Sequence, residues 1–179
     1  SSPKCRSKDS PPTGGAGACI VAELAGMIPT EVEKLILNGP PLLTEEEKEN
    51  VMSMIEKAPK MFPRKDGSHL TEIWQRRQQF TPGWTDLDAM HRGIIQMLRV
   101  TGDEIHGFRA AFSQNLEEVL SAIDVPTMIL TNTGDDIYFA AKRAALLRPD
   151  FSFLELEGGT HDIVDEQTQI WVKSVTDFL

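Results

Sequence analysis

The sequence contains only two cysteines, Cys5 and Cys19, and no long apolar run. Two cysteines without metal-binding spacing suggest a reducing compartment, so we expect a cytoplasmic protein. The alternative is a single disulfide between the two cysteines. No apolar stretch approaches the ~18–20 residues that a membrane-spanning helix needs. Positive charge is scarce, because 18 Lys and Arg residues face 27 Asp and Glu residues, giving a net charge of −9. This balance argues against a nucleic-acid backbone or an anionic membrane as partner.

The sequence also lacks a recognisable metal or phosphate site. His69, His91 and His106 form no pair at the i, i+4 spacing of a helical metal site, and no cysteine joins them. The glycine-rich stretch at 14–17 is not followed by a Lys-Ser/Thr pair, and no strand pattern precedes it, so a phosphate loop is not indicated. We therefore expect no metal and no cofactor.

Length and composition predict one globular domain. The chain has 179 residues, of which 40% are hydrophobic and 25% are charged. Residues 1–13 are polar and proline-containing, with no initiating methionine, so we expect a flexible arm, a processed end or an artificial chain start.

Short apolar runs alternate with helical patterns along the rest of the chain. Strands are predicted at 32–37, 126–131 and 151–156, and helices at 14–25, 44–58, 70–80, 86–100, 103–120, 138–147 and 167–179. This order predicts an α/β fold with a short parallel sheet flanked by helices. The core would comprise residues 14–43 and 124–179, and an inserted helical cap would comprise residues 44–123.

The last two predicted strands end in residues that perform acid–base chemistry. The first runs into Asp135 and Asp136, and the second runs through two glycines and a threonine into His161. Because parallel strands end at one edge of a sheet, we expect a carboxylate and an imidazole to meet there. A carboxylate on one ring nitrogen would allow the other nitrogen to take a proton from a nucleophile or from water.

This order of motifs resembles the carboxyl-terminal part of the α/β-hydrolase superfamily with a helical cap, over roughly residues 14–179. The resemblance implies a partial α/β-hydrolase fold and hydrolysis of an ester or related bond in a small organic substrate. It implies Asp136 as the acid, because Asp136-Ile137 matches the family's Asp before an apolar or proline residue, with Asp135 as the close alternative. It implies His161 as the base, after the glycine-rich residues that follow the last strand.

The family's nucleophile has no counterpart in this sequence. In the family, a Gly-x-nucleophile-x-Gly turn connects a strand to the buried helix. The matching segment is Thr-Gly-Gly-Ala-Gly at 13–17, so Gly15 occupies the nucleophile position. Residues 1–12 contain three prolines and scattered charges, which excludes a preceding strand. We expect Cys19 to be a small core residue rather than a thiol nucleophile.

Three functional hypotheses follow. In the first, which we prefer, the chain is a fragment of a longer active hydrolase. In the second, it is a non-catalytic ligand-binding or interaction module derived from a hydrolase. In the third, Asp136 and His161 activate water directly. The third fits least well because the family's oxyanion-hole loop is missing, and each such donor is worth ~3–4 kcal/mol of barrier.

Five aromatic residues of the predicted cap are candidates for contact with a small organic ligand. They are Trp74, Phe80, Trp84, Phe108 and Phe112. The simpler interpretation is that they form the core of the cap, and the alternative is an apolar pocket between cap and sheet. Arg76, Arg77 and Arg92 are expected to be solvated. An unpaired edge at the first strand predicts a homodimer or aggregation through that edge, unless the amino-terminal arm or another chain covers it.

Overall fold

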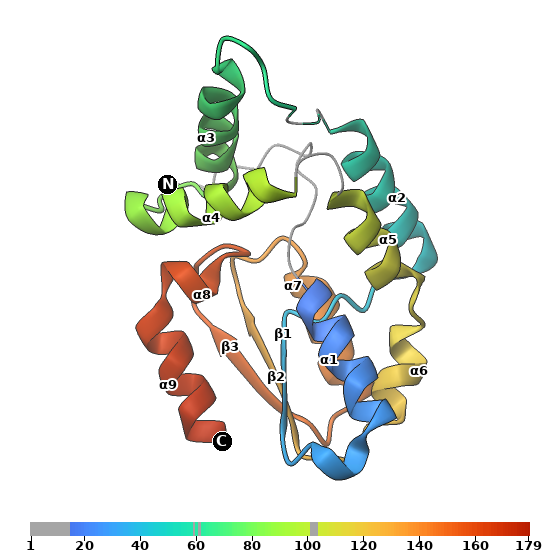
Figure 1. Ribbon diagram of the computed structural model, residues 1–179. Coiled ribbons are helices and arrows are strands. Elements are labelled where there is room, and N and C mark those ends of the chain that lie inside the picture. The colour runs from blue at the N-terminus through green and yellow to red at the C-terminus, as the bar shows by residue number, and fades with distance from the viewer. Residues whose placement is uncertain (1–14, 59, 61, 101–103) are drawn as a thin grey trace.

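The computed structural model describes residues 15–58, 60, 62–100 and 104–179. Within these residues, three parallel strands form one sheet in the order β1 (Leu35–Asn38), β2 (Thr127–Asn132) and β3 (Ser152–Leu156). Ile36 of β1 lies opposite Met128 of β2, and Met128 lies opposite Ser152 of β3. The three strands therefore end at one edge of the sheet, at the top in Figure 1.

Helices cover both faces of this sheet (Figure 1). One face carries α1 (Ala16–Met27), α6 (Leu116–Ser121) and α7 (Tyr138–Leu147), and the other carries α9 (Thr168–Phe178). A short 3₁₀ turn, η1 (Pro29–Glu31), leads from α1 into β1, and α8 (Ile163–Glu166) precedes α9. The result is a three-layer arrangement with the sheet in the middle.

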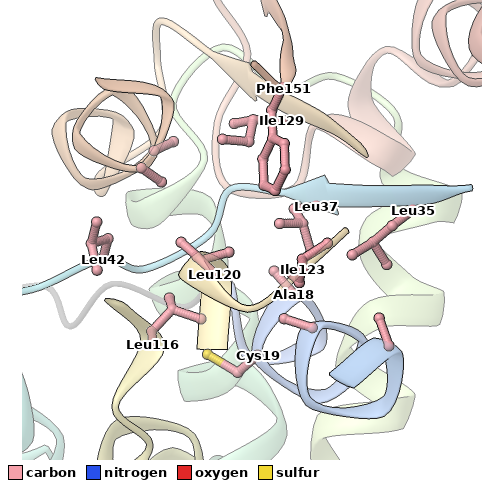
Figure 2. Close-up of a cluster of buried hydrophobic side chains, with 14 residues drawn as sticks. Ala18, Cys19, Leu35, Leu37, Leu42, Leu116, Leu120, Ile123, Ile129 and Phe151 are labelled. Atoms are coloured by element: carbon pink, nitrogen blue, oxygen red, sulfur yellow. The ribbon is translucent and has the colours of Figure 1, made fainter. Parts of the chain in front are cut away.

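The larger core lies between the sheet and the helices α1, α6 and α7. Figure 2 shows Leu37 of β1 and Ile129 of β2 in one cluster with Leu120 of α6, and all three side chains are fully buried. Small residues such as Ala22 of α1 and Ala144 of α7 allow the helices to approach the strands closely. Full burial of one Leu or Ile side chain contributes about 1.5–3 kcal/mol, so this cluster stabilises the core.

The opposite face of the sheet packs against α9. Met128 and Leu130 alternate with Ile129 along β2, so they point to this second face together with Trp171 of α9. The Trp171 indole Nε1–H donates a hydrogen bond of 2.9 Å to Asn38 Oδ1 at the end of β1. The carboxyl-terminal helix is therefore fixed to the sheet by both apolar and polar contacts.

Between β1 and α6, four further helices are described, and together with α6 they form the helical insertion. They are α2 (Glu45–Lys57), α3 (Ser68–Phe80), α4 (Leu87–Arg99) and α5 (Glu104–Ser113). The insertion begins with a capping box at α2, where Glu47 N–H donates to Thr44 Oγ1 at 3.3 Å and Thr44 N–H donates to Glu47 Oε2 at 2.7 Å. Figure 1 shows α3 and α4 beyond the carboxyl ends of the strands.

Some predicted elements are wrong in detail. The strand predicted at 32–37 begins only at Leu35, whose N–H donates to Pro126 O and starts the pairing with β2. The single helix predicted at 103–120 is two helices, because Asn115 Oδ1 accepts the Glu118 N–H and starts α6 anew. Helix α8 was not predicted. The predicted arm at 1–13 lies outside the described residues. Each described helix is too short or too polar to cross a bilayer.

Candidate active site

The turn after β2 carries two neighbouring carboxylates. Asp135 Oδ1 accepts the N–H of Ile137 at 2.9 Å, and its Oδ2 lies 3.2 Å from the position that a Cβ would occupy at Gly39. Asp136 Oδ2 lies 3.8 Å from His161 Nδ1. The structure therefore brings Asp136 to the histidine, and it shows Asp135 holding the turn at the start of α7.

The loop after β3 fixes the position of His161. Gly158 and Gly159 have φ angles of +72° and +69°, a region that glycine adopts without the strain of a side chain. Thr160 is buried, and its N–H and Oγ1–H donate to Glu166 Oε2 at 2.6 Å and 3.0 Å. The side chain of His161, the next residue, is only 4% exposed.

The acid turn and the histidine loop are joined directly. Asn132, at the end of β2, donates from Nδ2 to Gly158 O at 2.8 Å and to Thr160 O at 3.1 Å. Gly134 N–H donates to the same Gly158 oxygen at 3.0 Å. A Cβ at Gly134 would lie 1.9 Å from Gly159 O, so a side chain cannot fit there without movement of one loop. These contacts hold Asp136 and His161 in a fixed relation.

The His161 ring lies between two carboxylates. Asp136 approaches Nδ1 at 3.8 Å, an ion-pair distance longer than a hydrogen bond, and Nδ1 has no hydrogen-bond partner among the described residues. Asp162 Oδ2 lies 3.2 Å from Nε2. Burial lowers the pKa of His161, but Asp136 and Asp162 outweigh burial and raise the pKa to about 9. In this arrangement the ring is therefore an imidazolium at neutral pH.

Arg77 of α3 reaches the same ring from the helical insertion. Its Nη1 lies 3.2 Å from His161 Nε2, and its Nη2 donates to Asp162 Oδ2. Burial raises the pKa of Asp162, but His161 and Arg77 outweigh it and hold the pKa below its usual value, so this carboxylate is ionised. Arg77 and Asp162 therefore cover the ring nitrogen that would accept a proton from a nucleophile.

The involvement of Arg77 corrects the sequence-based expectation that it is solvated, since the residue is only 8% exposed. Its partners lie 84 and 85 residues away in the chain, so their contact could not be read from the sequence. One weak signal was present: Arg77 follows Ile73 by four residues and so shares its buried helix face. Asp162 was also missed, although it adjoins His161.

The position that matches the family's nucleophile is closed to a side chain. Gly15 has a φ angle of +90°, and a Cβ there would lie 2.6 Å from Gly39 O and 2.8 Å from Pro41 Cδ. Cys19, one turn further along α1, is 3% exposed within the core, as expected. Burial raises the pKa of its thiol to about 11, and Lys48 lowers it only in part, so Cys19 is not a thiolate at neutral pH.

The five candidate aromatic residues are not gathered at one place. Trp74 and Trp84 pack in a cluster with Ile73 and Met90 between α3 and α4. The guanidinium carbon of Arg77 lies 5.9 Å from the centre of the Trp84 ring, so Trp84 is connected to the His161 network.

The other three aromatic residues lie elsewhere in the insertion. Phe108 and Phe112, with ring centres 6.1 Å apart, pack with Val51 and Ile137 near the start of α7. Phe80 lies under the Arg76 guanidinium, whose carbon is 6.0 Å from the ring centre. In the described part of the chain, no group of His, Cys, Asp and Glu side chains could hold a metal ion.

An apolar groove lies between α1 and the helices α5 and α6, on the flank of the sheet. Its volume is about 1050 Å³, and its lining includes Ile20, Leu24 and Met27 of α1 with Val119 of α6. Ile20 and Met27 are 67% and 72% exposed. The groove is therefore built from a helix face that none of the described residues covers, and its lining includes neither Asp136 nor His161.

The overall fold of the chain is similar to that of known structures. A bromoperoxidase from Bacillus anthracis superposes with a TM-score of 0.66 and 17% identity, over 92% of this chain and 64% of that chain. The chain has a partial α/β-hydrolase fold. An enol-lactonase from Burkholderia xenovorans LB400 matches with a TM-score of 0.60, 16% identity and coverage of 92% and 63%. A thermophilic esterase from Thermogutta terrifontis matches with a TM-score of 0.58, 18% identity and coverage of 92% and 62%.

The comparisons confirm the fold inferred from the sequence, including the short parallel sheet flanked by helices. The chain spans less than two thirds of the length of these structures. No family model and no curated protein sequence matches it. The roles of Asp136, His161 and the aromatic residues stay predictions.

Proposed function

We propose that this chain supplies the acid–base half of a hydrolase active site, acting on an ester or related bond of a small organic substrate. The observation that carries the proposal is the 3.8 Å approach of Asp136 Oδ2 to His161 Nδ1 at the carboxyl ends of neighbouring parallel strands. In this role Asp136 orients the ring and stabilises its charged form. Nε2 of His161 accepts the proton of the nucleophile and later delivers it to the leaving group.

In this proposal, residues 44–123 act as a cap whose movement exposes the histidine. Arg77 of α3 contributes the contact at His161 Nε2 and the ion pair with Asp162. While these contacts persist, Nε2 cannot take a proton from a nucleophile. Reaction therefore requires two changes: the imidazolium must first lose its proton, and α3 must withdraw Arg77 from the ring or a substrate must replace it.

The proposal further holds that the complete active site belongs to a longer protein. Three observations support this: the closed position at Gly15, the exposed face of α1, and coverage of only 62–64% of the hydrolase-fold structures compared above. We expect the same locus to encode upstream strands and a strand-to-helix turn that carries Ser, Cys or Asp as the nucleophile. A natural protein that starts near Ser1 would contradict this part of the proposal. Homodimerisation and a cytoplasmic location also stay predictions.

The acid–base role is tested in the longer product with p-nitrophenyl acetate as substrate. His161→Gln is expected to lower kcat/KM by ~10²–10⁴-fold, because it removes the general base. Asp136→Asn is expected to lower it strongly as well, because the ring loses its counter-charge. His91→Gln changes an exposed histidine of α4 and serves as the matched control. Wild-type activity in the His161 variant would rule out the role.

A non-catalytic ligand-binding module is the second candidate. The observations that favour it are the closed position at Gly15 and the cover that Arg77 and Asp162 place over His161 Nε2. Under this alternative, His161→Ala leaves ligand binding nearly intact. Direct activation of water by Asp136 and His161 is the third candidate, and it predicts weak esterase turnover by the 179-residue chain that His161→Ala abolishes.

A further inference from the structure

The helical insertion is divided between two separate hydrophobic cores. One core joins Val51 of α2 and Phe112 of α5 to Ile137 and Ala140 of α7. The other consists of side chains from α3, α4 and the turn between them: Ile73, Trp74, Trp84, Ala89, Met90, Ile94 and Leu98. Figure 1 shows α3 and α4 on one side of the insertion and α2 and α5 on the other. Residues 62–100, which we call the α3–α4 unit, therefore have a core of their own.

Helices α2 and α5 are fixed to the helices that cover the sheet. Arg143 of α7 donates from Nη1 and Nη2 to the two carboxylate oxygens of Glu47 in α2, at 2.7 Å and 2.9 Å. Its Nη1 also donates to Leu42 O at 2.7 Å. Gln114, which follows α5, donates from Nε2 to Cys19 O of α1 at 3.3 Å. This half of the insertion is therefore held to α1 and α7 by polar contacts as well as by its apolar core.

The α3–α4 unit is joined to the candidate site through Arg77. The guanidinium carbon of Arg77 lies 5.9 Å from the centre of the Trp84 ring, so this side chain packs within its own unit. Its Nη2 donates to Asp162 Oδ2 in the loop after β3, and the same oxygen lies 3.2 Å from His161 Nε2. The guanidinium and the imidazolium are both donors, and neither can accept a hydrogen bond from the other. The Asp162 carboxylate therefore bridges the two cations and holds the unit over the ring.

A buried ion pair of this kind specifies a geometry without adding much net stability. The side chains of Arg77 and Asp162 are only 9% and 18% exposed. Formation of the pair removes both charges from water, and their mutual attraction mainly offsets that cost. Separation returns both charges to water, so the pair itself opposes separation only weakly. Removal of one partner is different, because it leaves the other charge buried and unpaired and strongly disfavours the closed arrangement.

We propose that the α3–α4 unit moves as one body while α2 and α5 stay fixed, and that the Arg77–Asp162 ion pair is the latch that holds the unit over His161. The inference rests on the proposed function, because the latch regulates access to the histidine of that site. It narrows the moving part of the cap from residues 44–123 to residues 62–100. It also assigns Asp162 a role in closure of the cap, which no sequence pattern indicated.

The test measures distances between two spin labels on the 179-residue chain by pulsed electron paramagnetic resonance. The labels are attached at exposed positions, with Gln96→Cys in α4 or Glu49→Cys in α2, each combined with Thr176→Cys in α9. Cys5→Ser removes a competing thiol, and Cys19 is only 3% exposed and stays unlabelled. The labelled chain is diluted with an excess of unlabelled chain, so that distances between two copies do not contribute.

Two variants open the latch from its two sides, Arg77→Gln on the unit and Asp162→Asn on the loop after β3. In each, we expect the ratio of longer to shorter α4–α9 distances to rise about tenfold or more, because one buried charge loses its partner in the closed arrangement. The α2–α9 distances should stay as in the wild type. Arg64→Gln is the matched control, since its ion pair with Glu72 lies inside the unit, and it should leave the α4–α9 distances unchanged. Should one latch variant fail to fold, the other decides the question.

Two results would overturn the proposal. Unchanged α4–α9 distances in the latch variants would mean that the ion pair does not hold the unit. Lengthened α2–α9 distances alongside lengthened α4–α9 distances would mean that the insertion moves as one body. The measurement involves no turnover, so it is independent of the proposed function. Lengthened α4–α9 distances together with hydrolysis unaffected by His161→Gln in the longer product would remove the function and keep the latch. Unchanged distances with hydrolysis lost in that variant would do the reverse.

Discussion

At the residue scale, the charge state of His161 governs what the site can do. Its ring is buried between Asp136 and Asp162, and Arg77 lies against Nε2. Because two carboxylates outweigh the cost of burial, the ring holds its proton more tightly than a free histidine. The arrangement therefore stabilises the imidazolium, which is the state of a histidine that has already accepted a proton.

This charge state predicts a pH-dependent stability. The pKa of His161 is about 9 in the folded chain, against an ordinary value of 6.5. The stabilisation is fully present below pH 6.5 and is lost as the pH rises through about 9. The free energy of unfolding in urea should fall across this window by on the order of 3 kcal/mol. His161→Gln should flatten the fall, whereas the exposed-site control His91→Gln should keep it. A fall of equal size in both variants would contradict this assignment.

A second prediction at this scale concerns Gly15. Its φ of +90° and the approach of Gly39 O to within 2.6 Å of a would-be Cβ leave no place for a side chain. Gly15→Ser should therefore lower the free energy of unfolding by at least ~1–2 kcal/mol and should not produce esterase activity. Gly17→Ala is the control, because a Cβ there meets nothing within 4 Å, and it should stabilise α1 by ~0.5–1 kcal/mol. A stable, hydrolytically active Gly15→Ser variant would show that the position is open.

At the scale of the elements, the site depends on two adjoining loops rather than on one. Asn132 at the end of β2 and Gly134 in the loop after it contact Gly158, Gly159 and Thr160 of the loop after β3. The distance between Asp136 and His161 is set by these contacts and by the pairing of β2 with β3. A substitution in either loop should therefore change the positions of both Asp136 and His161.

Gly134→Ala tests this dependence. Its Cβ would lie 1.9 Å from Gly159 O, so one loop must move. We expect a loss of on the order of 2–3 kcal/mol in the free energy of unfolding, and a lower pKa of His161 as Asp136 shifts away. Urea unfolding and a proton NMR titration of His161 measure the two effects. Gly26→Ala is the control, since a Cβ at this α1 position contacts nothing within 4 Å. Equal stability of the two variants would mean that the loops do not constrain each other.

The elements show what the sequence could predict and what it could not. Helix α7 was predicted at 138–147 and has those bounds, because its small apolar residues are bounded by turn residues on both sides. The helix predicted at 103–120 was wrong, because the apolar pattern continues through Asn115 while the backbone restarts there. Asp136 Oδ2 lies 3.8 Å from His161 Nδ1, because strand order makes the two loops neighbours, and the catalytic pairing of these residues stays a prediction. Arg77 and Asp162 depend on the docking of α3, which no local pattern encodes.

At the scale of the whole molecule, helix α1 leaves apolar side chains exposed in the described part of the chain. Ile20 and Met27 of α1 are 67% and 72% exposed beside the groove formed with α5 and α6. In the described residues, β1 pairs on one side only, with β2. An open strand edge beside an exposed apolar helix face favours association.

We therefore predict that the 179-residue chain self-associates at micromolar concentration in sedimentation velocity experiments. Ile20→Lys should shift the chain toward the monomer, because a charge on the α1 face opposes burial there. Leu146→Lys is the matched control, since Leu146 of α7 is 82% exposed and does not line the groove. A wild-type chain that sediments as a monomer would contradict the prediction.

We have proposed that Asp136 and His161 form the acid–base half of a hydrolase site whose nucleophile lies outside this chain. The most direct measurement compares p-nitrophenyl acetate hydrolysis by the 179-residue chain and by the longer product of the locus, each with and without His161→Gln. We expect no His161-dependent turnover by the 179-residue chain alone, and a loss of ~10²–10⁴-fold in kcat/KM when His161→Gln is introduced into the longer protein. The proposed division of the site is wrong if the chain alone shows turnover that His161→Gln abolishes, or if His161→Gln leaves the activity of the longer protein unchanged.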